Sequence, residues 1–364
     1  MQSKLRAGWN IFGQRNEIDL GFRAHFENQD RLQKNGPLPT SRDGVLVESN
    51  VRTADAWSGF VQNRFVFGKW GITPGVRVER VRYARINRLL SVRGATDLTQ
   101  IVPGVGISYS PSSRLTAFAG VHRGFAPPRA EDVINNSTGG VVDLDSELSW
   151  NYEAGLRARL HRRMALEATW FRMDFSNQII PASVAGGIGG TLISAGRTIQ
   201  QGAELSGRTE FRNLLGSRHS AWIRGAWTWV PTAEFASRRF STITGFAGTP
   251  VIGNRVPYTP SQLGNASVGY THSNGVNALV EGVYTARHYT DDLNTINPSP
   301  DGQRGRIPSA TIFNATLNYP VEAWHTTFFV SAKNLTDRLY IVDRARGLLP
   351  GMPRLVHVGM RFSF

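Results

Sequence analysis

Apolar and polar residues alternate one by one along much of this 364-residue chain. The clearest example is residues 17–27, in which the apolar side chains fall on even positions and the polar ones on odd positions. A period of two residues indicates a β-strand with one apolar and one polar face. A strand of a soluble β-sandwich would show the same pattern, so one such segment does not separate soluble from membrane proteins.

The series of alternating segments is more informative than any one of them. We predict about 15 strands, most of them near the ~10 residues that a tilted strand needs to cross a bilayer. They are residues 4–11, 17–27, 55–67, 72–82, 100–110, 115–123, 150–160, 164–175, 199–211, 220–229, 262–272, 276–285, 311–319, 326–334 and 354–364.

The connections between these segments alternate between short and long. Short turns fall at residues such as 68–71 and 161–163, and the long connections at residues 28–54, 83–98, 124–148, 176–198, 230–261, 286–310 and 335–352. Outer-membrane barrels have short periplasmic turns and long extracellular loops, whereas sandwiches and propellers need not separate their loops in this way. The pattern therefore predicts an all-β protein, an antiparallel transmembrane β-barrel with its long loops outside the cell.

Several short motifs resemble one known family. Residues 124–129 read GFAPPR, residues 144–147 read LDSE, residues 151–157 read NYEAGLR, and residues 333–340 read KNLTDRLY. Residues 351–354 (GMPR) then lead into a last strand that ends on Phe364. This order is similar to that in TonB-dependent outer-membrane receptors, with Ser146 standing where the family usually has proline.

The resemblance implies a larger molecule than this chain alone. Receptors of this family have a barrel of about 22 strands filled by a plug domain. We therefore expect residues 1–364 to be the C-terminal portion of such a barrel, without plug or signal peptide, since Met1 opens directly into a strand. An odd number of strands places the first and last strands parallel, so this portion should not close by simple antiparallel pairing. The resemblance also implies that TonB acts through the missing plug and that the barrel-assembly machinery reads the terminal Phe364.

Charge and composition refine this picture. The formal net charge is +14, the chain has no cysteine, and lysine stands at only four positions, so most cations are arginines. A genome rich in G+C would favour arginine codons, while a functional reason would be the capture of anions by guanidinium groups. The arginines are scattered, with no recognisable nucleic-acid-binding module, so we expect no nucleic acid partner. The chain contains no run of 18 apolar residues, so its sequence predicts no membrane-spanning helix.

The chain offers no convincing catalytic or metal-binding set. Its eight histidines show no metal-ligand spacing, and a G-x-S-x-G signature is missing. We therefore expect no enzyme, no cofactor and no resident metal. The resemblance implies an outer-membrane receptor that takes up an iron chelate, and residues 21–33 resemble the ferric-citrate subgroup. Haem, cobalamin or a sugar as the ligand, or a passive or structural barrel piece, remain alternatives.

Candidate ligand contacts lie in the predicted outer loops. They are Arg129, Arg197, Arg255, Arg287, His288, Tyr289, Arg306 and Arg344. Each arginine has an alternative role in solvation or in contact with lipopolysaccharide phosphate. On the polar face of the strand at residues 150–160, we expect Glu153, Arg157 and Arg159 to face the lumen.

Overall fold

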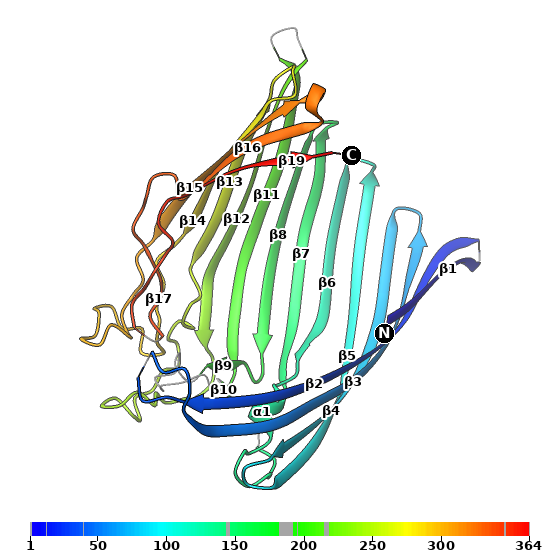
Figure 1. The fold of residues 1–364 in the computed structure, drawn as a ribbon. Helices are drawn as coiled ribbons and strands as arrows, with labels where there is room; N and C mark the ends of the chain where they lie inside the picture. Colours follow the sequence, from blue (N-terminus) through cyan, green and yellow to red (C-terminus); the bar gives the residue numbers. More distant parts are fainter. Residues whose placement is uncertain are drawn as a thin grey trace.

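The computed structural model describes residues 2–11, 13–38, 40–142, 146–181, 192–194, 196–214, 218–345 and 347–363. Its main feature is one sheet of 15 strands in which every neighbouring pair is antiparallel. The predicted all-β antiparallel fold and its strand number are confirmed. In the described part of the chain the sheet stays open between its edge strands, β1 and β19 (Figure 1).

The strands of this sheet follow one another in chain order. They are β1 (Gln2–Ile11), β2 (Gln14–Asn35), β3 (Val45–Phe67), β4 (Trp70–Asn87), β5 (Val92–Ser112), β6 (Leu115–Ala126), β7 (Glu147–His161), β8 (Met164–Phe175), β11 (Thr198–Leu214), β12 (His219–Phe235), β13 (Gln262–Thr271), β14 (Asn277–Thr285), β15 (Ala310–Val321), β16 (Thr326–Lys333) and β19 (Leu355–Phe362). Two short pairs stand apart from it, β9 (Ile179–Pro181) with β10 (Leu192–Ser194) and β17 (Ile341–Asp343) with β18 (Leu349–Pro350). Among the described residues, the helical pieces are α1 (Ala130–Val133) and the 3-10 turn Glu322–Trp324.

The strand register gives the sheet one polar and one apolar face. Arg52 lies opposite Arg85, and His122 lies opposite Asn151, so polar positions of successive strands share one side. The segment around α1 packs on this side, which we call the inner face. On the outer face, large apolar side chains are exposed strand after strand: Phe22, Val78, Ile101, Leu156, Leu205, Trp227, Val268, Val280, Leu317 and Val358. This is the arrangement of a barrel wall with lipid on one side and a polar lumen on the other.

The loop predictions at residues 28–54 and 83–98 were wrong in extent. β2 continues to Asn35 and β3 begins at Val45, while β4 and β5 are separated only by residues 88–91. These strand extensions pair with each other through their backbones and through ion pairs such as Arg31–Glu48, in which Nε and Oε2 are 2.9 Å apart. In these extensions apolar and polar residues do not alternate regularly, so a search for apolar alternation misses them.

Buried apolar side chains form two small clusters near the ends of the strands that carry the long connections. One joins Val81 and Tyr83 of the wall to Val133 and Ile134 of the α1 segment. The other joins Phe235, Val251 and Val256, with Leu293 packed against them. The connections therefore fold onto the sheet and onto each other, and they gather at one end of it (Figure 1). None of the helices in the described ranges is long and apolar enough to cross a membrane.

Two elements of the predicted motifs cannot be placed. Phe364, which we interpret as the assembly signal, lies outside the described residues, as do Leu144 and Asp145 of the LDSE motif. The strand that leads to Phe364 is present as β19, whose outward residues include Val356, Val358 and Met360, all exposed.

Candidate functional site

A cavity opens on the inner face, near the ends of β2, β3 and β4 that carry the long connections. Its volume is about 420 Å³, and the segment that precedes and includes α1 forms one wall. The hydroxyl of Tyr83 donates a hydrogen bond to the carbonyl oxygen of Pro128 over 2.8 Å and so holds this wall against β4. The lining residues include His25, Glu27, Gln29, Arg31, Arg52, Tyr83, Pro127, Pro128, Arg129, Ala130 and Glu131.

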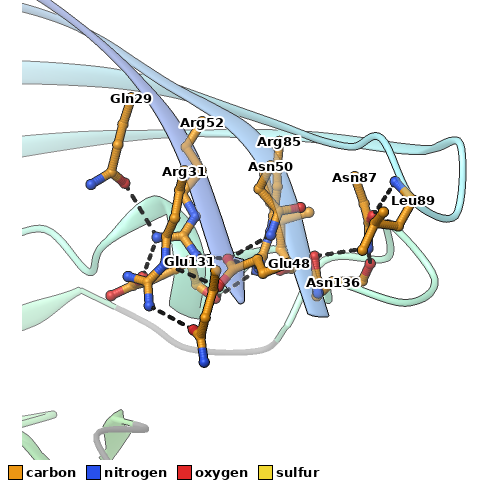
Figure 2. A network of polar contacts seen from close by, with 12 residues as sticks. Gln29, Arg31, Glu48, Asn50, Arg52, Arg85, Asn87, Leu89, Glu131 and Asn136 are labelled. Atoms are coloured by element: carbon orange, nitrogen blue, oxygen red, sulfur yellow. Dashed lines mark hydrogen bonds and ion pairs between the residues drawn. The ribbon is translucent and has the colours of Figure 1, made fainter. Parts of the chain in front are cut away.

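Two buried arginines anchor the α1 segment beside this cavity. Figure 2 shows Arg52 and Arg85 among the acidic groups that they contact, and their side chains are only 8% and 7% exposed. Arg52 pairs with Glu131 and also with Glu48, where Nη2 and Oε1 are 2.5 Å apart. Arg85 donates from Nη1 to the carbonyl oxygens of Glu131 (3.2 Å) and Ile134 (3.0 Å). Since breaking a buried ion pair is strongly destabilising, this network should keep the segment in one position.

Arg129 is the predicted ligand contact that reaches this cavity. Its side chain is 52% exposed, with Nε 2.8 Å from Oδ2 of Asp132 and Nη1 3.0 Å from Oε1 of Glu131. The hydrogen bond to Asp132 raises the pKa of Arg129 above its ordinary value. The guanidinium group is therefore oriented by two carboxylates yet still open to solvent, and its contact with a ligand remains a prediction.

A second group of candidates meets in the connections after β12, β14 and β16. Tyr258 lies at its centre, because its hydroxyl donates to Oδ1 of Asp343 over 2.5 Å and its amide donates to the carbonyl of Tyr289 over 2.8 Å. The amide of Arg344 donates to the Tyr258 hydroxyl over 3.2 Å, and the His288 ring lies 6.0 Å from the Tyr258 ring. Burial raises the pKa of Tyr258, so this phenol stays protonated and able to donate. Our sequence interpretation missed Tyr258, although its position in the stretch PYTP was a signal, since proline restricts the backbone on either side.

The side chains of Arg255 and Arg344 hold backbone rather than project freely. Arg255 donates to the carbonyl oxygens of Thr259 (2.8 Å), Pro231 (3.1 Å) and Val230 (2.7 Å). Arg344 is 4% exposed and donates from Nη1 to the carbonyl of Gly302 over 3.1 Å. Arg255 therefore ties the connection after β12 back to β12 itself, and Arg344 ties the connection after β16 to the one after β14.

A buried polar contact joins the connections after β12 and β14. Asp292 is fully buried, and its Oδ1 accepts a hydrogen bond from the hydroxyl of Ser241 over 2.9 Å. Nη2 of Arg239 lies 3.6 Å from Oδ2 of the same carboxylate. Burial raises the pKa of Asp292 above its ordinary value, and the neighbouring Ser241 and Arg239 oppose that shift. Together with the apolar cluster around Val251, this contact makes the two connections one folded unit.

The remaining candidates in the loops, Arg306, Arg287 and Arg197, make fewer contacts with the cavity beside α1 or with the group around Tyr258. The amide of Arg306 bonds to the carbonyl of Ile296, next to Ile307, which pairs through its backbone with His288. Arg287 and Arg197 are exposed, and the amide of Arg197 is held by the hydroxyl of Ser237 over 3.0 Å. The structure thus brings together Arg255, His288, Tyr289 and Arg344, with Arg306 next to the strand-like pair of Ile307 and His288, while Arg129 belongs to the separate cavity beside α1.

The three residues expected to face the lumen lie on the inner face of β7. Glu153 stands opposite Gly120 of β6, and Arg157 opposite Glu167 of β8, with Nε and Oε2 3.0 Å apart. The Arg157 guanidinium also lies 4.3 Å from the centre of the Phe118 ring. Arg159, two residues further along the same face, is exposed. Within the ranges that the structure describes, no group of three or more acidic or histidine side chains is placed to hold a metal ion.

Comparison with known proteins shows one family model and several solved structures to which this chain is similar. A family model described as "TonB dependent receptor-like, beta-barrel" matches residues 1–335. The solved structure of the ferric citrate transporter FecA matches with a TM-score of 0.76 and 19% identity over 99% of this chain and 53% of its own. The siderophore receptor PiuA from Acinetobacter baumannii matches with a TM-score of 0.74 and 15% identity, over 99% of this chain and 55% of PiuA. The ferric yersiniabactin uptake receptor FyuA from Yersinia pestis matches with a TM-score of 0.63 and 18% identity, over 98% of this chain and 51% of FyuA. At these identities the likeness is one of fold, and the chain spans about half the length of the structures it matches.

Proposed function

We propose that this chain, which belongs to the TonB-dependent receptor β-barrel family, serves in the outer membrane in the TonB-energised uptake of an iron chelate, a ferric siderophore or ferric citrate. Proteins of this family are outer-membrane barrels that act as receptors and transporters rather than enzymes. In this proposal residues 1–364 form one portion of the barrel wall with its outer loops, and TonB acts through a plug. Lipid, lipopolysaccharide and the barrel-assembly machinery are its other partners.

The observation that carries the proposal is the cavity beside α1. It opens on the polar inner face and is lined by Arg31, Arg52 and Arg129 together with Tyr83 and Gln29. Iron chelates present carboxylate, hydroxamate or catecholate oxygens, and guanidinium groups bind such oxygens through paired hydrogen bonds. Glu27 and Glu131 also line the cavity and balance part of its charge. This mixture favours a chelate with both acceptor and donor groups over a bare polyanion.

The overall charge supports capture at the same end of the sheet. The chain carries a formal net charge of +14, and the exposed side chains of Arg129, Arg197 and Arg287 lie in or beside the long connections. Cationic surfaces raise the rate at which an anionic ligand arrives, and this effect falls with ionic strength. We therefore expect ferric citrate or an anionic ferric siderophore to bind better than a neutral chelate.

The proposal is tested by ligand binding to the intact receptor, including whatever segments its gene encodes around this chain. Cells lacking other iron-chelate receptors would express it and be offered chelates labelled with radioactive iron. Arg129→Gln should weaken binding of the matching chelate about tenfold, because it removes a charge-assisted hydrogen bond. The matched control is Arg80→Gln, because Arg80 lies on the outer face, where its Nη2 is 3.3 Å from Oδ2 of Asp97, and should leave binding unchanged.

Three results would contradict the proposal. Saturable binding of haem, cobalamin or a sugar in place of every iron chelate would assign another ligand class. Passive, non-saturable permeation of small solutes would instead indicate a pore. Equal loss of binding in Arg129→Gln and Arg80→Gln would show that the cavity beside α1 is not the place where the chelate binds.

A further inference from the structure

Two histidines meet at the end of the sheet opposite to the long connections. His219 opens β12, and His272 directly follows the last residue of β13. Because Ser220 of β12 pairs with Thr271 of β13, the next positions place His219 and His272 opposite each other. Their ring centres are 4.5 Å apart, and the ring planes cross at 78°. The strand register thus brings together two imidazoles that show no metal-ligand spacing in the sequence.

The two rings lie on the outer face of the sheet and are open to solvent. His272 stands two residues after the exposed Tyr270 and so lies on the same side of the sheet. Backbone hydrogen bonds hold the short turn that His272 begins. The amide of His272 donates to the carbonyl of Val276 over 2.8 Å, and the amide of Gly275 donates to the carbonyl of His272 over 3.0 Å. The backbone at His272 is therefore fixed while its side chain stays accessible.

One nitrogen of each ring is already held by an oxygen atom. Nδ1 of His219 lies 2.6 Å from the hydroxyl oxygen of Tyr270, and Nδ1 of His272 lies 2.8 Å from Oδ1 of Asn274. Oδ1 of Asn274 can only accept, and it also accepts from the amide of Val276 over 3.1 Å. The amide nitrogen of Asn274 lies further from Nδ1 of His272, at 3.3 Å, so we assign a proton to this Nδ1. The lone pair is then on Nε2, as in histidines that bind a metal and donate from their other nitrogen to an oxygen.

The distance between the rings suits one shared metal ion. Within the part of the chain that the structure describes, Nε2 of neither ring makes a hydrogen bond. A transition-metal ion binds an imidazole nitrogen at about 2.0–2.1 Å and therefore lies about 3.2 Å from the ring centre. Two rings that bind one ion at an angle of about 90–110° then have centres about 4.5–5.2 Å apart. The observed 4.5 Å lies at the lower end of this range, so the backbone need not move.

We propose that His219 and His272 bind one divalent transition-metal ion through Nε2 of both rings. Imidazole is a ligand for Cu²⁺, Zn²⁺ and Ni²⁺, and Cu²⁺ forms the strongest complexes of this series. Tyr270 and Asn274 orient the two rings through Nδ1. Two protein ligands leave coordination positions open, so water completes the shell and the ion exchanges with its surroundings. The short turns of an outer-membrane barrel face the periplasm, so the ion comes from that side. The proposal does not depend on which ligand is transported.

Substitutions separate the metal ligands from the groups that orient them. His219→Asn and His272→Asn should each weaken Cu²⁺ binding at least about 100-fold, because two linked ligands exceed one by about 10²–10⁴. Tyr270→Phe removes the oxygen that orients His219 and should weaken binding about tenfold. His161→Asn is the matched control, because His161 ends β7 beside another short turn and its Nδ1 contacts the amide of Arg163 over 3.4 Å. This control should leave Cu²⁺ binding unchanged.

The experiment is a titration of the intact receptor, without an affinity tag, with Cu²⁺, followed by electron paramagnetic resonance. We expect one tightly bound Cu²⁺ whose spectrum shows two coordinating imidazole nitrogens, and the variant effects given above. The spectrum of the unchanged receptor tests the pair even where a variant fails to fold.

Three results would overturn the proposal. A spectrum with one imidazole nitrogen or none would exclude a shared ion. Tight binding that persists in both His219→Asn and His272→Asn would place the ion elsewhere. An equal loss of binding in His161→Asn would indicate unspecific adsorption to surface histidines. Full affinity in Tyr270→Phe would overturn the orienting role of Tyr270.

Discussion

Replacement of Arg85 by methionine should release the segment around α1 from the inner face of the sheet. Arg85 is 7% exposed and donates hydrogen bonds to the carbonyl oxygens of Glu131 and Ile134, and its Nη2 lies 3.7 Å from Glu48. Methionine retains much of the apolar stem but none of the donors. Both carbonyls and the Glu48 carboxylate would then lose a partner in a place that water reaches poorly.

The size of the effect follows from these contacts. A buried acceptor that loses its donor costs about 1–3 kcal/mol, so two carbonyls together cost about 2–6 kcal/mol. Removal of the buried guanidinium returns part of its desolvation cost, which lowers the net effect. A net loss of about 3 kcal/mol in the free energy of local opening raises the equilibrium population of the open segment roughly 100-fold.

Hydrogen exchange of the intact receptor measures this opening directly. The reporters are the amides of Asn135, Gly139 and Val142, which bond to the carbonyls of Gly140, Asn135 and Val133 within the same segment. Their exchange should accelerate about 100-fold in Arg85→Met, and amides of the paired β7 and β8 strands should not change. Arg80→Met is the matched control, since Arg80 is half exposed on the outer face and an exposed ion pair contributes little.

Unchanged exchange at all three reporters in Arg85→Met would refute the reasoning. It would mean that the apolar contacts of Val133 and Ile134 hold the segment without the buried arginines. Equal acceleration in Arg80→Met would refute it in another way, because the effect would then come from the whole sheet.

Three further changes test the loop contacts. Arg255→Lys keeps the charge but loses the fork to three carbonyls, so limited proteolysis after β12 should become faster; an unchanged rate would assign Arg255 only a charge role. Tyr258→Phe removes the 2.5 Å contact with Asp343 at a cost of about 1–2 kcal/mol, seen as faster exchange of the Arg344 amide, and no change would exclude Tyr258 as the link. Burial raises the pKa of Asp292, so its protonated form favours the closed loops, and this contribution is lost as pH rises through the raised pKa. Protection of residues 239–256, corrected for intrinsic exchange, should therefore fall as pH rises from the ordinary carboxyl pKa of about 3.9 through the raised pKa of Asp292, and Asp292→Asn should flatten that dependence.

The strands of the wall were predictable because one face of each is apolar and the other is polar. In β7, exposed Trp150, Tyr152 and Leu156 alternate with Glu153 and Arg157, so the sequence carries the period of two without interruption. The extensions of β2 and β3 were not predictable in this way. The β2 extension is polar on both faces apart from Leu32, and the β3 extension opens on three consecutive apolar residues, 45–47, so neither alternates. Pairs such as Arg31 with Glu48 stabilise the hairpin from opposite strands.

The candidate site was predictable in type but not in arrangement. Arginines in the long connections could be recognised from sequence, whereas the ion pair of Arg129 with Asp132 was not predicted. Nothing in the sequence pattern placed Arg52 and Arg85 in one network with Glu131, because β3, β4 and α1 come together only through tertiary packing. The same is true of Tyr258 and Asp343, which are 85 residues apart in the chain.

The most direct measurement is iron uptake with and without TonB. Cells that express the intact receptor as their only iron-chelate receptor would be given ferric citrate and a panel of ferric siderophores labelled with radioactive iron. Our account predicts saturable accumulation of at least one of these chelates in cells with TonB, and binding without accumulation in cells from which TonB has been deleted. Equal accumulation in both strains, or no saturable binding of any chelate in either, would contradict it.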